Sequence, residues 1–126
     1  DTETRLAGLL HALLPTMQDG ANSANPFRFA DSGIQHMTAA MEKRGASRQR
    51  LQAKLTGGAC LYHYERSCAA TEIGERNIAM ARATLRELGI PLIAQHVGGV
   101  YGRSIRFEQQ TFQVRINILS QGVLII

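Results

Sequence analysis

The first apolar stretch of the chain covers residues 5–14 and contains a single histidine, His11. Pro15 ends this stretch, and a segment rich in Gly, Asn, Ser and Pro follows as far as Pro26. A short apolar run bounded by turn-forming residues is typical of a buried β-strand. The pattern therefore predicts a buried strand over residues 5–14, with His11 inside it, and then a long loop.

Apolar positions that recur at helical spacing predict two amphipathic helices. They are Ile34, Met37 and Met41 in the first helix, and Ile78, Ala81, Leu85 and Leu88 in the second. The first helix is predicted to begin at Ala30, and Arg76 and Asn77 are expected to open the second. Gly45 and Gly89 stand where a left-handed residue commonly ends a helix, so we expect the two helices to end there.

Alternating polarity and short apolar runs predict β-strands in the rest of the chain. The predicted strands cover residues 51–56, 91–97, 104–108 and 111–118, and the tail over residues 120–126 is ambiguous. Gly57-Gly58 and Gly98-Gly99 end the first two of these strands, and Gln109-Gln110 joins the last two as a hairpin. This order of elements predicts an α/β (α+β) domain in which two main helices cover one mixed β-sheet.

The chain has 126 residues, of which 44% are apolar, enough for a single domain over residues 1–126 with one core. Its longest apolar stretch is far shorter than the roughly 20 residues needed to cross a bilayer, so no membrane insertion is expected. The chain begins with Asp1 instead of Met and carries no signal-peptide pattern. We therefore expect the natural protein to extend upstream of Asp1, which makes this chain an N-terminally truncated domain.

The formal charge of +4 comes from Arg and Lys residues spread along the chain, without the basic cluster typical of nucleic-acid binding. Nucleic-acid binding is a hypothesis that rests on charge alone, and no such partner is expected. Cys60 and Cys68 fit neither a disulfide scaffold nor a CxxC site, which favours a reduced, cytoplasmic protein. His36, His63 and His96 lack metal-ligand spacing, so neither a metal nor a cofactor is expected.

Several short motifs occur along residues 8–116. They are a small and apolar run with His and Leu-Pro at Gly8–Pro15, an aromatic-Ala-Asp motif at Arg28–Ser32, Ala-Lys-x-x-Gly-Gly-Ala at Ala53–Ala59, Ile-Gly-x-Arg-Asn at Ile73–Asn77, and Gly98-Gly99 followed by Arg103. In this order and spacing they resemble the motifs of the chemoreceptor glutamine deamidases of bacterial chemotaxis, the CheD family. The resemblance implies a compact α/β sandwich that hydrolyses glutamine side chains of chemoreceptors to glutamate, and a CheC-type chemotaxis phosphatase as docking partner.

Amide hydrolysis by a thiol needs a base that activates the nucleophile and an acid that protonates the leaving ammonia. By its match to the family motif, His11 is implied to fill both roles. Without the resemblance, a lone His on an apolar strand is more simply a hydrogen-bonded core residue. The family's nucleophilic Cys, in a Gly-Ser-Cys segment, and its supporting Thr precede the His strand, so both are expected upstream of Asp1. The chain as given is then expected to be inactive, with an exposed sheet edge where that strand belongs.

Gly57, Gly58 and Ala59 are candidates for a loop that offers main-chain N–H groups to an oxyanion or a substrate amide. An equally simple interpretation is a tight turn that needs positive φ at glycine. The candidates for loop support, with structural roles favoured, are Arg76, Asn77, Gly98, Gly99 and Arg103. Tyr62 lies just beyond the Gly-Gly-Ala turn and is the candidate contact for the phosphatase, because tyrosine is enriched at interface centres.

Neither cysteine of the chain is expected to replace the missing nucleophile. Cys60 precedes the apolar Leu61 and is interpreted as a small packed side chain. Cys68 stands near Arg66, which could favour its thiolate, but the sequence shows no base at a fixed spacing from it. The alternative function is a non-catalytic binding module that docks a CheC-type phosphatase or a receptor.

Overall fold

The computed structural model describes residues 1–20, 25–60 and 69–126 of the chain. The helices are α1 (Ala30–Glu42) and α2 (Ala69–Glu87), and the strands are β1 (Ala53–Gly57), β2 (Leu92–Val97), β3 (Arg103–Glu108), β4 (Gln113–Ile118) and β5 (Gly122–Ile125). Short 3₁₀ turns lie at Met17–Gly20, Pro26–Arg28 and Arg48–Arg50.

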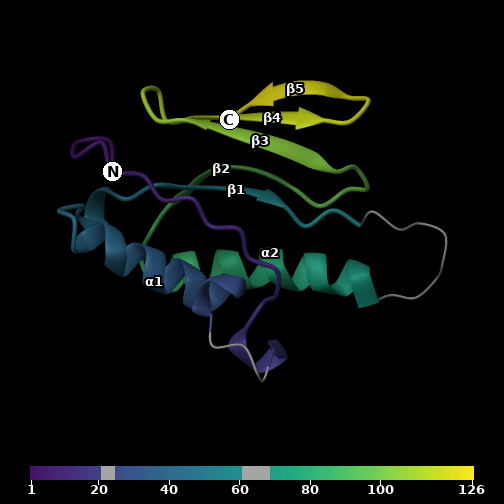
Figure 1. Ribbon diagram of the computed structural model, residues 1–126, viewed down its shortest axis with the longest axis horizontal. Coiled ribbons are helices and arrows are strands. Elements are labelled where there is room, and N and C mark those ends of the chain that lie inside the picture. Colours follow the sequence, from purple (N-terminus) through teal and green to yellow (C-terminus); the bar gives the residue numbers. More distant parts are fainter. Residues whose placement is uncertain (21–24, 61–68) are drawn as a thin grey trace.

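These elements form three layers (Figure 1). The two helices make one outer layer, the parallel pair β1–β2 makes the middle layer, and the antiparallel sheet β3–β4–β5 makes the other outer layer. The predicted α+β class with two main helices is confirmed. The strands are divided between two sheets, where the sequence indicated one mixed sheet.

The helical layer packs as the apolar spacing predicts. Ile34 of α1 and Leu85 of α2 belong to a buried cluster that extends to Leu51 before β1. Both helices end in glycines with positive φ, +102° at Gly45 and +70° at Gly89, which confirms the predicted helix ends. The start of α2 differs from the prediction, because the helix already begins at Ala69.

The prediction of a buried strand over residues 5–14 is wrong. Its single ladder contact within the described residues is an isolated parallel bridge between Leu14 and Phe29, and His11 is exposed. Leu10 packs on the helical core, whereas Leu9 and Leu13, on the opposite face, are 71% and 50% exposed. The apolar run suggested burial on both faces, but the described chain covers only the face that lies on the helices.

The two sheets are connected by Lys54, which lies on β1 and is half-buried. Its ammonium group donates to the main-chain oxygens of Phe112 at 2.6 Å and Ile126 at 2.9 Å, and both of these residues flank strands of the outer sheet. Beneath that sheet, Ile116 is fully buried and forms a small core with its neighbours on β4. Hydrogen bonds from a charged donor are stronger than neutral ones, so Lys54 fastens the outer sheet to the middle layer.

We predict that Lys54→Met lowers the free energy of unfolding by about 1.5–3 kcal/mol, because two charge-assisted hydrogen bonds are lost between the layers. Urea denaturation followed by circular dichroism measures this change. Lys43→Met, an exposed position just after α1, serves as the control and should change the stability by less than about 0.5 kcal/mol. Equal stability of the two variants would contradict the role given to Lys54.

Candidate functional site

The glycine turn that ends β1 lies directly on α2. Gly57 and Gly58 have positive φ values of +119° and +64°. A Cβ atom at Gly58 would lie 2.5 Å from Cδ1 of Ile78 and 3.0 Å from the carbonyl oxygen of Gly74. Positive φ and close approach both require glycine at position 58. Within the described residues, the main-chain N–H groups of Gly58 and Ala59 make no hydrogen bond and are therefore available as donors.

A second glycine turn, at the end of β2, pairs with the first. The Gly98 N–H donates to the Gly57 carbonyl at 2.9 Å, and the Cys60 N–H donates to the Gly99 carbonyl at 2.9 Å. Both Gly98 and Gly99 have positive φ. Because β1 and β2 are parallel, their carboxyl ends meet at the same edge, and the two turns form one loop cluster there.

Arg103, the first residue of β3, closes this cluster from the outer sheet. Its Nη2 donates to the Gly98 carbonyl at 2.5 Å, and its Nε donates to Nδ1 of His96 at 2.8 Å. In this bond Nδ1 of His96 is the acceptor, because the guanidinium can only donate. Burial lowers the pKa of the Arg103 guanidinium from its ordinary value.

Asn77 joins the segment that carries His11 to the same part of α2. Its Nδ2 donates to the Leu13 carbonyl at 3.1 Å, two residues beyond His11. Gly74 and Ile78, which contact the first glycine turn, are neighbours of Asn77 on the helix. The structure therefore places the His11 segment and the Gly57-Gly58 turn on one stretch of α2. The exposed imidazole lies on the face of its segment that points away from the helical core.

Two buried polar atoms at this site have no hydrogen-bond partner in the described part of the chain. They are the hydroxyl oxygen of Thr56 and the side-chain oxygen of Asn77. Thr56 precedes the glycine turn and pairs in register with His96. Buried oxygens without a partner cost stability, and such atoms at a site are available to a ligand or a further segment.

Other candidates from the sequence are not gathered at this site. Arg76 was expected to open α2 but lies inside the helix, with an exposed side chain. Cys60 joins the loop cluster only through its main chain, and it is half-buried. Tyr62 and Cys68 lie outside the described residues. Among the residues that the structure does describe, no group of three His, Cys, Asp or Glu side chains could hold a metal ion.

Sequence reasoning missed the contributions of His96 and Thr56. His96 was rejected as a metal ligand and expected to have an ordinary surface or packing role. Its bond to Arg103 joins two strands whose contact no local pattern reveals. The alternation of side chains along β1 offers a weak signal, because Thr56 lies on the same face of the strand as Lys54. Only the fold of the backbone brings these groups to the glycine turns.

The clash at Gly58 leads to a stability prediction with a matched control. Gly98→Ala should cost about 1–2 kcal/mol of unfolding free energy, because alanine is strained at a φ of +72° but meets no atom within 4 Å. Gly58→Ala has a similar φ and also forces a shift of Ile78 or α2, so it should cost at least about 1 kcal/mol more. Equal losses in urea denaturation would show that the turn does not pack tightly on α2.

No helix in the described part of the chain is both long and apolar enough to span a membrane.

Comparisons with a family model and with individual known proteins point to the same family. The family described as CheD chemotactic sensory transduction matches residues 13–118. A relative from Pyrococcus horikoshii, named probable chemoreceptor glutamine deamidase CheD, is 41% identical over 125 residues, which are 99% of this chain and 76% of the relative. Relatives of the same name from Moorella thermoacetica and Caldanaerobacter subterraneus are 39% and 36% identical, over 100% and 98% of this chain and 76% of each relative. The chain therefore belongs to the CheD family.

Proposed function

We propose that this protein deamidates specific glutamine side chains of chemoreceptors to glutamate, in the cytoplasm. The observation that carries the proposal is the match to relatives named as probable chemoreceptor glutamine deamidases, among them the P. horikoshii protein at 41% identity over 99% of the chain. Methyl-accepting chemoreceptors are the proposed substrates. The reaction needs no cofactor, because a thiol, an imidazole and main-chain donors supply all of its chemistry.

We propose His11 as the general base and acid, and a cysteine upstream of Asp1 as the nucleophile. The match to the P. horikoshii protein covers 76% of it, so about a quarter of that relative lies outside the match. Two features of the described chain support a neighbouring strand at this place. The edge of β1 that faces away from β2 pairs with no described strand. The main chain of residues 7–12 makes no backbone hydrogen bond to the described part of the chain.

A largely apolar cavity beside the His11 segment gives further support. It has a volume of about 180 Å³ and lies between this segment, α1, the start of β1 and the outer sheet. Leu6, Met37, Leu51, Phe107 and Val114 are among the residues that line it. An apolar strand that enters here would cover this cavity and place its side chains next to the exposed face of His11.

The proposed reaction has two stages. His11 takes the proton of the thiol, and the thiolate attacks the side-chain carbonyl carbon of glutamine, while N–H groups of Gly58 and Ala59 bind the oxyanion. Collapse of this intermediate breaks the C–N bond, and the imidazolium gives its proton to the departing ammonia, which leaves a thioester. Water then attacks the thioester as His11 takes its proton, the C–S bond breaks, and the imidazolium returns the proton to the leaving thiolate. The products are glutamate and the regenerated thiol.

Support of the active loops is the proposed role of the surrounding residues. Arg103 holds the Gly98-Gly99 turn through the Gly98 carbonyl, and that turn binds the Gly57 carbonyl. Asn77 holds the segment of His11 through the Leu13 carbonyl. These contacts support positioning roles, because each fixes main-chain groups without presenting its own side chain to the reaction. Arg76 stays a candidate for the same role.

A CheC-type phosphatase is a further proposed partner, and its candidate contact Tyr62 lies outside the described residues. If the protein were instead a non-catalytic module that docks this phosphatase or a receptor, it would bind such partners without converting glutamine. A protein that had lost the segment with the nucleophilic cysteine would keep only this docking function. The two functions are separated by the conversion of a receptor fragment.

We predict that His11→Ala lowers the deamidation rate of the full-length protein by about 10²–10⁴-fold, because the thiol loses its base and ammonia its acid. The assay follows conversion of glutamine to glutamate on a receptor cytoplasmic fragment by mass spectrometry. His36→Ala is the control, since His36 is an exposed residue of α1 whose Nδ1 contacts the Ser32 carbonyl. It should retain full activity.

Two outcomes would contradict the proposed function. Absence of conversion by the wild-type full-length protein would leave only the binding module. Undiminished conversion by His11→Ala would show that another group acts as base, and the mechanism would be wrong even though the activity stands.

A further inference from the structure

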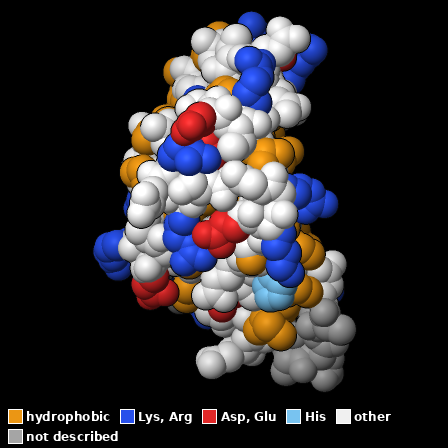
Figure 2. All heavy atoms as spheres, turned by 90° about the vertical axis from the view of Figure 1, so that its left-hand side faces the viewer, with side chains coloured by type: hydrophobic (Ala, Val, Ile, Leu, Met, Phe, Trp, Pro, Cys, Tyr) orange, Lys and Arg blue, Asp and Glu red, His pale blue; other side chains and the backbone are white. Residues whose placement is uncertain are grey.

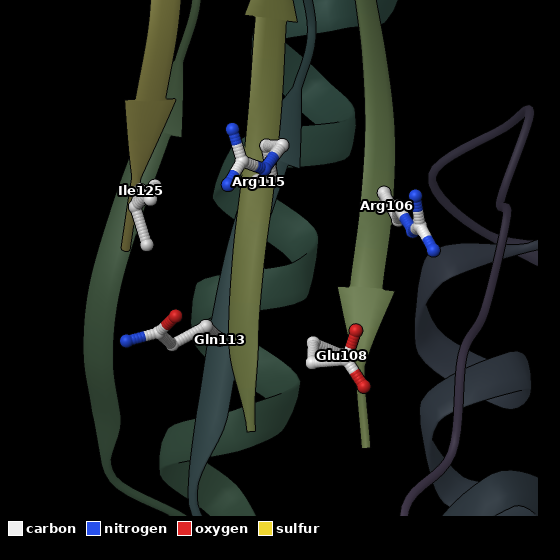
Figure 3. A pocket seen from close by; sticks show the side chains of 5 residues that line it. All are labelled: Arg106, Glu108, Gln113, Arg115 and Ile125. Atoms are coloured by element: carbon white, nitrogen blue, oxygen red, sulfur yellow. The ribbon is translucent and has the colours of Figure 1, made fainter. Parts of the chain in front are cut away.

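The outer face of the three-stranded sheet carries an arrangement of charge that the proposed deamidation does not use. Along β4, Val114, Ile116 and Ile118 are buried against the middle layer, so Gln113 and Arg115 point outward. Figure 3 shows Arg106 and Glu108 of β3, Gln113 and Arg115 of β4, and Ile125 of β5 along this sheet. These five residues line a shallow depression of about 400 Å³.

Two arginines in this depression stand directly opposite each other. Arg106 and Arg115 are register partners in the antiparallel pair β3–β4. Like charges at directly opposite positions destabilise a sheet. Neither guanidinium forms an ion pair with the described residues, although Glu108 also lines the depression. Among the described residues, no acidic side chain offsets the repulsion between Arg106 and Arg115.

Two exposed arginines at the end of the helical layer do have acidic partners among the described residues. On the face where α1 ends, acidic and basic side chains lie next to one another (Figure 2). Arg48 binds Glu42 at 2.8 Å, and Arg50 binds Asp1 at 2.8 Å. Arg106 and Arg115 differ from these two in having no acidic partner among the described residues, and their register pairing places both positive charges at one point of the outer sheet.

Apolar side chains extend this charged depression toward β5. Ile125 is 47% exposed, and Val123, which also points outward, is 56% exposed. A surface that combines two guanidinium groups with exposed aliphatic side chains fits a ligand that has both carboxylates and apolar groups. Arginine binds carboxylates through two parallel hydrogen bonds, which gives such a contact both strength and direction.

We propose that this outer face, made by Arg106, Arg115, Val123 and Ile125, docks an acidic, amphipathic segment of a partner protein. Carboxylates of the segment bind the two arginines, and its apolar side chains cover the two aliphatic residues. Two arginines offer few contacts to a nucleic-acid backbone, so an acidic segment of a protein fits this face better. The face lies on the side of the outer sheet away from the helices (Figure 1), so it does not belong to the loop cluster at the ends of β1 and β2.

A fluorescein-labelled peptide built from Glu, Leu and Ala serves as the probe, and fluorescence anisotropy with the full-length protein measures its binding. Binding should weaken as salt is added, because exposed charges are screened. The R106E/R115E variant should bind at least about tenfold more weakly, as expected when attraction becomes repulsion at two sites. Glu108→Gln should bind more tightly than the wild type. A peptide with Ser in place of Leu should bind more weakly.

The control is R44E/R86E, which makes the same change in net charge at exposed positions of the helical layer. It should bind the probe as the wild type does. Circular dichroism verifies the fold, and R106Q/R115Q replaces the reversal variant if that variant is unfolded. No binding by the wild type, or equal loss in R44E/R86E, would overturn the proposal. Tighter binding of a labelled oligothymidine than of the peptide, lost in R106E/R115E, would also overturn it and identify a nucleic-acid surface.

Discussion

The close approach of the Gly58 turn to α2 is the constraint on which the site depends. A Cβ at Gly74 would lie 2.8 Å from the Gly58 carbonyl oxygen, and a Cβ at Gly58 would overlap Ile78. Glycine on both sides lets the end of β1 rest on the helix backbone. The turn then offers its carbonyl at Gly57 to the second glycine turn, which Arg103 holds from the outer sheet. The contact between the backbones of Gly58 and Gly74 thus joins the helical layer to the loop cluster, where the middle and outer layers also meet.

The segment of His11 is bound to the same part of α2 through a side chain of the helix. Asn77 binds its main chain at Leu13, while alternate side chains lie on the helical core or point outward. His11 belongs to the outward set, where an imidazole can exchange protons with groups that approach from outside. A buried, hydrogen-bonded histidine, the simpler interpretation of the sequence, could not do so. The exposure of His11 agrees with a role toward a group beyond the described chain.

Local signals predicted the elements that depend on local forces. Both helices and their glycine ends follow from spacing and from positive φ at Gly45 and Gly89. The tail was ambiguous because β5 exists only through its pairing with β4, after a turn with positive φ at Ser120 and Gly122. The division into two sheets depends on long-range contacts. Among them are the hydrogen bonds of Lys54 to Phe112 and Ile126, which lie 58 and 72 positions further along the chain. No pattern within a short window contains that information.

The candidate site was predictable to a similar degree. The order of short motifs indicated the family and pointed to the two glycine turns, which the structure brings together. The extent of α2 and the exposure of His11 were not predicted, because an apolar run does not reveal which of its faces is covered. The bond between Arg103 and His96, and the unpartnered oxygen of Thr56, depend on how the outer sheet lies over the middle layer.

A crystal structure of the full-length protein tests the account most directly, through the distance between the His11 ring and the nearest cysteine thiol. We predict an added strand beside residues 7–12 and a thiol sulfur within about 3.5 Å of an imidazole nitrogen, the reach of a nucleophile and its base. An imidazole that stays exposed with no thiol within that reach would contradict it.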